Sequence, residues 1–542
     1  MAEPAPRLPQ AASKSASGSL FNTREELDST RTTELVLALC GPIGSDIHKV
    51  GEKLQELLKR DFGYQYCEII RLSEIIREQS KGTQIPSDEY EKLKRLIELG
   101  DELRQKHGNG VLAEIAVGKI AYARRQAERS TSQTTHQARR VCHIIDSIKN
   151  QEELDILRAV YGDMIYFVGV FSSVEVRVKN LEKRPMTPDK IWELIDKDSG
   201  EEFSYGQTVR NTFPQADFFL RTEFNNDAEI ESKVERFLHL ILNSRVLTPS
   251  FAEQAMYAAA SAAGNSACLS RQVGAALTDA AGEIISIGWN DVPKFGGGLY
   301  GADPADDPTG KNDQRCWNRE GGLCYNDQYK RLTAESLVAK LVKGKFIDVT
   351  KSEDAIKCIL EDSQLKDLIE FSRSIHAEMH AIIVGCKLGG DRVRGGKLFT
   401  TTYPCHSCAR HIVDAGISEV YYIEPYRKSL ATKLHDDSIT ENEKDTSRVV
   451  LLPYNGVAPS KYLKLFRMTP DSRKKNGKMI KIDFREASPR FEKRLEAFPK
   501  LEAMIVEGLV RKKLIPETNE QQKQQAPKAK ETNVVNIAET QL

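Results

Sequence analysis

Residues 34–48 read ELVLALCGPIGSDIH, and this stretch decides how the first half of the chain folds. The apolar run LVLALC is short and uninterrupted, which is typical of a strand buried on both faces. A glycine-rich turn follows it and leads into a helix-like segment that ends near Lys59. A strand, a glycine turn and a helix form the start of an α/β unit, so the sequence predicts a parallel sheet covered by helices.

Four further apolar runs support this prediction within residues 33–246. Segments with helical periodicity separate them, as expected when crossover helices join parallel strands. The runs are YCEII at 66–70, VCHIID at 141–146, MIYFVGVF at 164–171 and ADFFL at 216–220. Pro249 then indicates a boundary, because a proline disfavours helix at the residue before it. We therefore expect the first domain to cover residues 33–246.

A second α/β unit is predicted over residues 247–512. An alanine-rich helix at 251–264 precedes two strands, VGAALTD and EIISIGWN, and alternating helices and strands follow from 374 to 423. Residues 296–372 are predicted to be an insertion that begins rich in Gly, Asp and Pro. The segments 1–32 and 513–542 have the composition of disordered tails.

The chain has 542 residues, of which 78 are basic and 78 are acidic. This balance excludes a global attraction to nucleic acid, so a polyanionic partner would have to meet a local cluster of charge. No apolar stretch approaches the run of about 20 residues that a membrane-spanning helix needs. The N-terminus lacks the apolar block of a secretory signal. We therefore expect a cytoplasmic protein with reduced cysteines and no membrane partner.

Two short motifs in the second unit have the residue types and spacing of a metal site. His376 and Glu378 lie in HAEMHAI, and Cys405 and Cys408 lie in PCHSC at the start of the next predicted helix. A catalytic zinc has three nitrogen or sulfur ligands and one position open to water, which predicts His376, Cys405 and Cys408 as ligands. Glu378 is then the candidate catalytic residue for proton transfer. For an isolated CxxC pair, the alternatives are a structural zinc knuckle or two core thiols.

These motifs and their surroundings resemble the zinc-dependent deoxycytidylate (dCMP) deaminases. SRQVGAALTDAAGEIISIGWNDVP is similar to their first helix-to-strand segment, and KLFTTTYPCHSCARHIVDAGISEVYYIEPY follows their pattern closely. The resemblance implies a cytidine-deaminase-like α/β/α domain that hydrolyses a deoxycytidine nucleotide. It also implies that Asn290, Arg271 and His435 contact the substrate. The alternative for Arg271 is an ordinary surface ion, and the alternative for Asn290 is a turn-forming role.

A second, structural zinc occurs in some members of that family. Cys268, Cys316 and Cys324 are the candidate ligands in this chain. His380 stands where the family has asparagine and is a candidate fourth ligand. Free thiols in a loop are the alternative interpretation.

GPIGS resembles a P-loop, and residues 33–246 resemble a nucleoside-monophosphate or deoxynucleotide kinase. A working P-loop reads G-x-x-x-x-G-K-[ST], but Asp46, Ile47 and His48 stand where the second glycine, the lysine and the hydroxyl residue belong. A carboxylate there repels phosphate and an isoleucine cannot neutralise it. We therefore expect a kinase-like domain with a regulatory role.

The candidate contacts of a regulatory nucleotide are Gly41, Gly44, Ser45 and Asp146. Asp146 ends a predicted strand, where such kinases have a Walker-B carboxylate, and Arg177 stands where they have a lid arginine. A strand-end aspartate and a surface arginine are the alternatives.

The fusion of an altered kinase-like domain to a deoxycytidylate-deaminase-like domain resembles the bacterial anti-phage dCTP/dCMP deaminases. That resemblance implies depletion of dCTP during infection and an inhibitory small RNA. The deaminase fold further implies a homo-oligomer, either a dimer or a hexamer. Two other functions stay open, namely a nucleic-acid-editing cytidine or adenosine deaminase and a bifunctional deoxynucleotide kinase–deaminase. The acidic segment GADPADDPTG at 301–310 disfavours the editing enzyme, which needs a basic groove.

Overall fold

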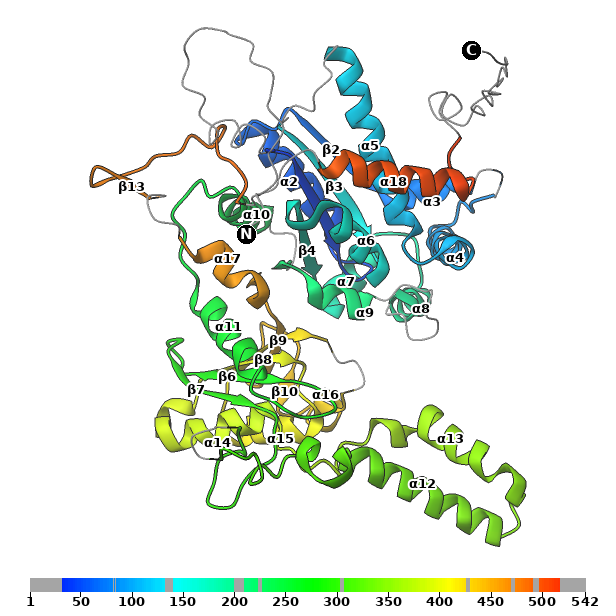
Figure 1. Ribbon diagram of the computed structural model, residues 1–542, viewed down its shortest axis with the longest axis vertical. Helices are drawn as coiled ribbons and strands as arrows, with labels where there is room; N and C mark the ends of the chain where they lie inside the picture. Colours follow the sequence, from blue (N-terminus) through cyan, green and yellow to red (C-terminus); the bar gives the residue numbers. More distant parts are fainter. Residues whose placement is uncertain are drawn as a thin grey trace, which may run out of the picture.

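The computed structural model describes most of the chain in two α/β bodies, one above the other in Figure 1. The described residues are 32–80, 82, 84–131, 140–198, 209–222, 227–302, 307–425, 429–468, 473–490 and 497–516. The predicted tails lie outside them, except for their innermost residues. None of the described helices combines the length and the apolar character needed to cross a bilayer.

The N-terminal body is built on a parallel sheet centred on β1 (Leu35–Cys40), all of whose side chains are buried. Its neighbours are β3 (Val141–Ile148) and β4 (Ile165–Phe171), with β2 (Tyr66–Arg71) and β5 (Phe218–Arg221) outside them. All five strands run in the same direction. The parallel sheet predicted from the apolar runs is therefore confirmed.

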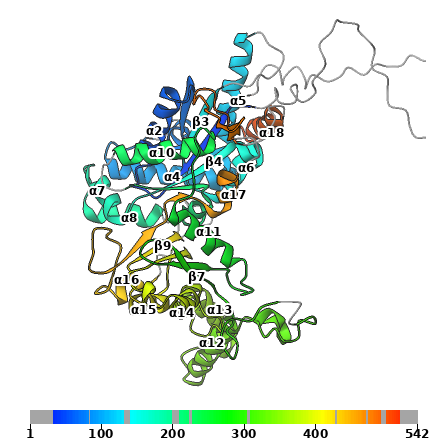
Figure 2. The same cartoon turned by 90° about the vertical axis from the view of Figure 1, so that its left-hand side faces the viewer.

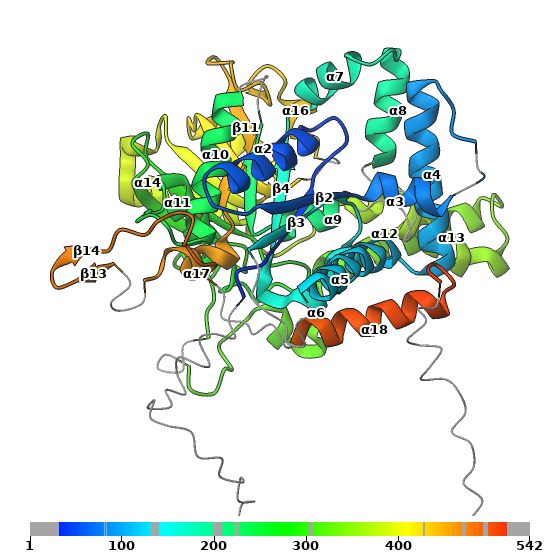
Figure 3. The same cartoon turned by 90° about the horizontal axis from the view of Figure 1, so that it is seen from above.

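Helices cover both faces of this sheet (Figure 3). α2 and α10 lie on one face, and α5 and α6 lie on the other, while α4, α7 and α8 stand beside the sheet. The helices are α2 (Ile47–Arg60), α3 (Leu72–Gln79), α4 (Glu89–His107), α5 (Val111–Thr131), α6 (Gln151–Tyr161), α7 (Val174–Glu182), α8 (Pro188–Asp198), α9 (Val209–Thr212) and α10 (Asp227–Ile241).

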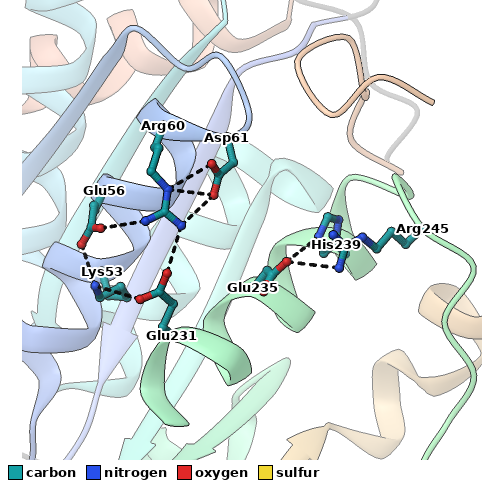
Figure 4. A network of polar contacts seen from close by, with 8 residues as sticks. All are labelled: Lys53, Glu56, Arg60, Asp61, Glu231, Glu235, His239 and Arg245. Atoms are coloured by element: carbon teal, nitrogen blue, oxygen red, sulfur yellow. Dashed lines mark hydrogen bonds and ion pairs between the residues drawn. The ribbon is translucent and has the colours of Figure 1, made fainter. Parts of the chain in front are cut away.

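Charged side chains join α2 to α10 on the outer surface (Figure 4). Arg60 is bonded to Glu231 across the helices at 2.9 Å and to Glu56 within α2 at 3.1 Å. Lys53 also reaches Glu231, at 3.4 Å. Because these groups are solvated, they contribute little to stability, and the buried apolar residues between the helices hold the pair in place.

The C-terminal body is built on a mixed sheet with the order β10-β11-β9-β8-β6-β7. β6 and β7 are antiparallel to their neighbours, and the other four strands are parallel. The strands are β6 (Gly274–Thr278), β7 (Ile284–Trp289), β8 (Lys397–Thr402), β9 (Glu419–Glu424), β10 (Ile439–Thr440) and β11 (Val449–Pro453). This arrangement confirms a second α/β fold.

Helices lie on both faces of the second sheet. α11 (Phe251–Ala263) covers one face, and α14 (Ala377–Gly389) packs on β7 and β6 from the other, next to α15 (His406–Asp414). Gly288 in β7 permits this close approach, because a Cβ there would clash with the backbone of Ala377 and Ala381. The resulting contact fixes where α14 begins, and the candidate metal ligands lie at that point.

The insertion forms a helical hairpin that projects from the C-terminal body (Figure 1 and Figure 2). It consists of α12 (Tyr325–Lys343) and α13 (Ser352–Asp362), which pack together around Ala334, Val338 and Ile356. The hairpin has this small apolar cluster of its own, separate from the cluster under the sheet.

The end of the described chain returns to the N-terminal body. β12 (Gly456–Val457) pairs antiparallel with β5, and α18 (Ala497–Arg511) packs on α5. α17 (Tyr462–Phe466) lies between the bodies, and β13 (Lys474–Lys475) with β14 (Lys478–Met479) forms a small hairpin. The second domain predicted from the sequence extends to residue 512. The structure differs because a two-residue strand and an amphipathic helix give no sequence signal of their distant partners.

One continuous apolar core joins the two bodies. It includes Phe219 of β5, Met256 and Ala259 of α11, and Phe399 of β8. Glu253, buried in the first turn of α11, accepts a hydrogen bond from the backbone N–H of Val457 at 3.0 Å. The bodies therefore share packed side chains and backbone pairing as well as a linker.

A buried ion cluster fastens α18 to the N-terminal body. The Arg124 guanidinium donates to Glu34 at 2.7 Å and makes two bonds of 3.1 Å to Glu502 of α18. We expect Arg124→Met to lower the free energy of unfolding by about 3–5 kcal/mol, because it leaves two buried carboxylates without their cation. Urea unfolding followed by circular dichroism measures this change.

The matched control for that variant is Arg511→Met, which removes an exposed pair with Glu507 at the far end of the same helix. It should change stability only slightly. Equal stability of the two variants would show that the buried cluster does not hold α18.

Candidate active site

Three predicted metal ligands gather at the first turns of two adjacent helices. His376 is the residue before α14, Cys405 is the residue before α15, and Cys408 lies in the first turn of α15. His376 Nδ1 is 3.2 Å from Cys408 Sγ and 3.3 Å from Cys405 Sγ. One ligating atom from each of the three residues lies within 4.8 Å of the others. His376 precedes the two cysteines by 29 and 32 positions in the sequence, yet the three side chains converge on one point.

This donor set fits zinc in both chemistry and spacing. A tetrahedral zinc with ordinary bond lengths separates a nitrogen and a sulfur ligand by about 3.5 Å, close to the separations in this cluster. The Cys408 N–H also points to Cys405 Sγ at 3.4 Å. A hydrogen bond from the Cys408 thiol lowers the pKa of Cys405 to about 4, which favours a thiolate.

Glu378 lies one residue into α14, next to this cluster. Its side chain is buried and lies beside the Cys408 thiol. Burial raises the pKa of Glu378, because the charged carboxylate is removed from water. The position places a carboxyl group beside the three ligating atoms, as a proton-transferring residue requires.

A buried aspartate, Asp291, holds the segment that leads to His376. The carbonyl of Asp291 accepts a hydrogen bond from the N–H of Ile375 at 3.0 Å, and its carboxylate accepts one from Ala267 N at 3.0 Å. Arg315 of the insertion donates to the same carboxylate at 3.3 Å and makes a tighter pair with Asp313. The start of the insertion is therefore part of the framework of the site.

Asn290 and Arg271 lie together on the loop beside β7. The Asn290 side chain accepts from Val273 N at 2.7 Å and donates to the carbonyl of Arg271 at 2.8 Å. Arg271 forms an ion pair with Glu424 at the end of β9 and is half exposed. In this structure the Asn290 amide shapes the loop, and the role of both residues in substrate contact stays a prediction.

His435 follows the short helix α16 (Ala431–Leu434), which packs against α15. Ser429, just before that helix, donates to the carbonyl of Pro404 at 2.8 Å and so fixes the segment next to the PCHSC motif. His435 is partly buried. Its substrate contact also stays a prediction.

The candidate ligands of a second zinc do not come together in the structure. Within the described ranges, the only group of three or more ligating residues is His376, Cys405 and Cys408. Two of the other candidates have different neighbours. Cys324 lies 3.5 Å from Ser270 Oγ, and His380 packs edge-on against the Trp289 ring and accepts a hydrogen bond from the backbone N–H of Trp289 at 3.3 Å. A hydrogen bond to Cys405 raises the pKa of His376 to about 9, and Cys268 lies near enough to add a smaller effect in the same direction.

The predicted nucleotide contacts lie at the carboxyl end of the first sheet. Gly44 and Ser45 line a cavity of about 710 Å³, whereas Gly41 and Asp146 are not among its lining residues. Arg177 does not face the cavity as a lid residue would, because it is largely buried and donates to the carbonyl of Ile43 at 2.7 Å. The basic residues around this cavity were not predicted, because they come from several separate segments of the chain and each resembles a solvated charge.

Comparison with known proteins agrees with this geometry. Residues 249–424 match the family model of the cytidine and deoxycytidylate deaminase zinc-binding region. This match lies within the C-terminal body and includes all three residues of the His376, Cys405 and Cys408 cluster.

Three relatives illustrate the similarity in sequence. ComE operon protein 2 of Bacillus subtilis is 45% identical over 56 residues, 10% of this chain and 29% of that protein, so the chain matches under a third of its length. Deoxycytidylate deaminase of Enterobacteria phage T4 is 26% identical over 30% of this chain and 72% of its own. A UPF0200 protein of Saccharolobus islandicus is 23% identical over 33% of this chain and 82% of its own.

Two solved structures resemble the chain in part. The dCMP deaminase from the cyanophage S-TIM5, in complex with dCMP and dUMP, covers 38% of this chain and 99% of its own, with 20% identity and a TM-score of 0.22. Shikimate kinase from Bacteroides thetaiotaomicron covers 38% of this chain and 97% of its own, with 14% identity and a TM-score of 0.23.

Proposed function

We propose that this protein is a zinc-dependent hydrolase that deaminates a deoxycytidine nucleotide, dCTP or dCMP, to the uracil form and ammonia. One observation carries the proposal: His376, Cys405 and Cys408 converge on one point with the buried Glu378 beside them. The family of the domain and the deoxycytidylate deaminase of phage T4 among its relatives support the choice of substrate class.

Each residue of the cluster has a distinct part in this reaction. His376, Cys405 and Cys408 would hold the zinc, which when bound activates water for attack on C4 of the pyrimidine. The Glu378 carboxylate accepts a proton from the attacking water and delivers it to ring N3. It then moves the proton of the new C4 hydroxyl to the amine, so that C4 becomes a carbonyl and ammonia leaves. The buried position of Glu378 keeps bulk water from competing for the proton.

The fusion to a kinase-like body supports the further roles implied by the anti-phage family. These are depletion of dCTP in the cytoplasm during infection and inhibition by a small RNA. We also propose a homo-oligomer, a dimer or a hexamer, as is common for the deaminase fold. Size-exclusion chromatography with light scattering tests the assembly directly.

The activity is tested by offering dCTP, dCMP, CTP and cytidine separately to the purified zinc-loaded protein and measuring uracil products. Turnover of dCTP is expected and supports the defence role. Turnover of dCMP alone would leave the deaminase chemistry intact but refute the depletion of dCTP. Turnover of an oligonucleotide together with silence on all four small substrates would refute the proposed substrate class.

A further inference from the structure

Arg221, the last residue of β5, reaches from the N-terminal body to the C-terminal body. Its guanidinium donates to Glu443 at 2.7 Å, in the segment between β10 and β11. Its backbone N–H donates to the side chain of Asn455 at 3.0 Å, just before β12. Because only 13% of the Arg221 side chain is exposed, this contact is less screened than an ion pair on an open surface.

The segment that receives the guanidinium also contacts the loop of a candidate metal ligand. Glu441, two residues before Glu443, accepts a hydrogen bond from the Tyr403 hydroxyl at 2.9 Å. Tyr403 is buried, and its ring packs edge-on against Tyr422 of β9, with the ring centroids 4.8 Å apart. Tyr403 lies two positions before Cys405 in the chain. A displacement of the segment 441–443 would therefore act on the loop that carries Cys405.

On its other side, Arg221 is linked to the altered P-loop. The side-chain oxygen of Thr222, the next residue, lies 2.6 Å from that of Ser172, and both residues are buried. Ser172 lies just before α7, and Asn180 of α7 donates to the carbonyl of Gly44 in the altered P-loop at 3.0 Å. The altered P-loop, α7 and the end of β5 are thus joined by hydrogen bonds at the carboxyl edge of the first sheet.

We propose that Arg221 is a positioning residue for the deaminase site, acting through the segment 441–443 and Tyr403 on the loop that carries Cys405. This inference rests on the proposed deamination and names the contacts by which the N-terminal body controls it. A catalytic constellation has to be held to within about 0.5 Å of its productive geometry, so loss of these contacts lowers turnover. A rearrangement of α7 reaches the site by the same contacts.

The first test separates kcat from KM in the full-length, zinc-loaded protein. Arg221→Ala is expected to lower kcat by about tenfold or more and to change KM by less than about threefold, because a displaced ligand loop affects the reaction more than binding. Tyr403→Phe, which removes only the hydroxyl, should show the same pattern. Arg221→Lys keeps a cation that can reach Glu443 and should recover most of the rate. Zinc content should stay unchanged in all three variants.

The second test needs no turnover. The visible absorption spectrum of the protein loaded with Co²⁺ in place of zinc depends on the geometry of the metal ligands. Arg221→Ala and Tyr403→Phe should shift the cobalt bands in the same way. The double variant should differ little from Tyr403→Phe alone in both spectrum and kcat, because the two changes break one series of contacts.

Lys464→Ala is the matched control at the same junction. It removes an ion pair of 2.8 Å between α17 and Asp163 of the N-terminal body. Lys464 is not part of the contacts that lead to Tyr403, so its loss should leave both kcat and the cobalt spectrum as in the wild type. Thermal melting by circular dichroism confirms that each variant is folded.

Three results would overturn the positioning role of Arg221. They are a folded Arg221→Ala variant with wild-type kcat and cobalt spectrum, equal damage from Arg221→Ala and Lys464→Ala, and effects of Arg221→Ala and Tyr403→Phe that add independently. If the wild type deaminated no deoxycytidine nucleotide, the proposed function would fail. A shift of the cobalt bands in Arg221→Ala, absent in Lys464→Ala, would then still support the positioning role, so the two failures are distinguishable.

Discussion

Replacing Glu378 with glutamine is expected to lower the rate of deamination by about 10²–10⁴-fold. Glutamine preserves the shape of the buried side chain beside Cys408 but cannot accept a proton from water or return it to the leaving amine. Zinc binding should be unchanged, because the three ligating atoms come from other residues. The measurement combines uracil-nucleotide formation with the zinc content per chain.

Glu370 offers a matched control at the rim of the same site. It is half exposed and lies 3.5 Å from His406 Nε2 at the start of α15. Glu370→Gln should deaminate at close to the wild-type rate. If Glu378→Gln retained that rate as well, the proton would have to travel by another group and the assignment of Glu378 would be wrong.

Cys408→Ser is expected to remove the metal, leaving less than about a tenth of an equivalent of zinc per chain, and to abolish activity. Cys408 is fully buried, and its Sγ faces both His376 and Cys405, so no solvent-exposed group can take its place. A serine hydroxyl is a poor zinc ligand compared with a thiolate. Metal analysis after dialysis measures the loss.

The exposed Cys386, on α14, is the control for cysteine removal in general. Cys386→Ser should keep both zinc and activity. Full zinc content in a folded Cys408→Ser variant would contradict the ligand set. Circular dichroism separates that outcome from simple unfolding.

The parts of the fold that the sequence predicted are those set by local patterns. β1 is uniformly apolar because both of its faces are covered, and such a run is visible without knowing its neighbours. The metal cluster could also be predicted from the sequence, because histidine and cysteine are the ligands that zinc prefers and their spacing is typical of a zinc site. The roles of His376, Cys405 and Cys408 in the reaction stay predictions, whereas the structure shows that their side chains converge.

The parts that the sequence missed depend on contacts between distant segments. The two residues of β12 are too short to show a period, and they form a strand only because β5 offers a free edge. The hydrogen bonds of Asn290 could not be predicted from the sequence either, because they depend on where the neighbouring backbone lies. An asparagine that binds a ligand and one that braces a loop look the same until the backbone around it is placed.

The return of the chain to β5 has a consequence for its synthesis. Roughly 230 residues separate Arg221 at the end of β5 from Gly456 at the start of β12, and α18 follows later still. At ordinary rates of translation, a ribosome needs about 10–50 s to cover that distance. During this interval the newborn N-terminal body has an open strand edge and an uncovered α5, so it is exposed to pairing with strands of other chains.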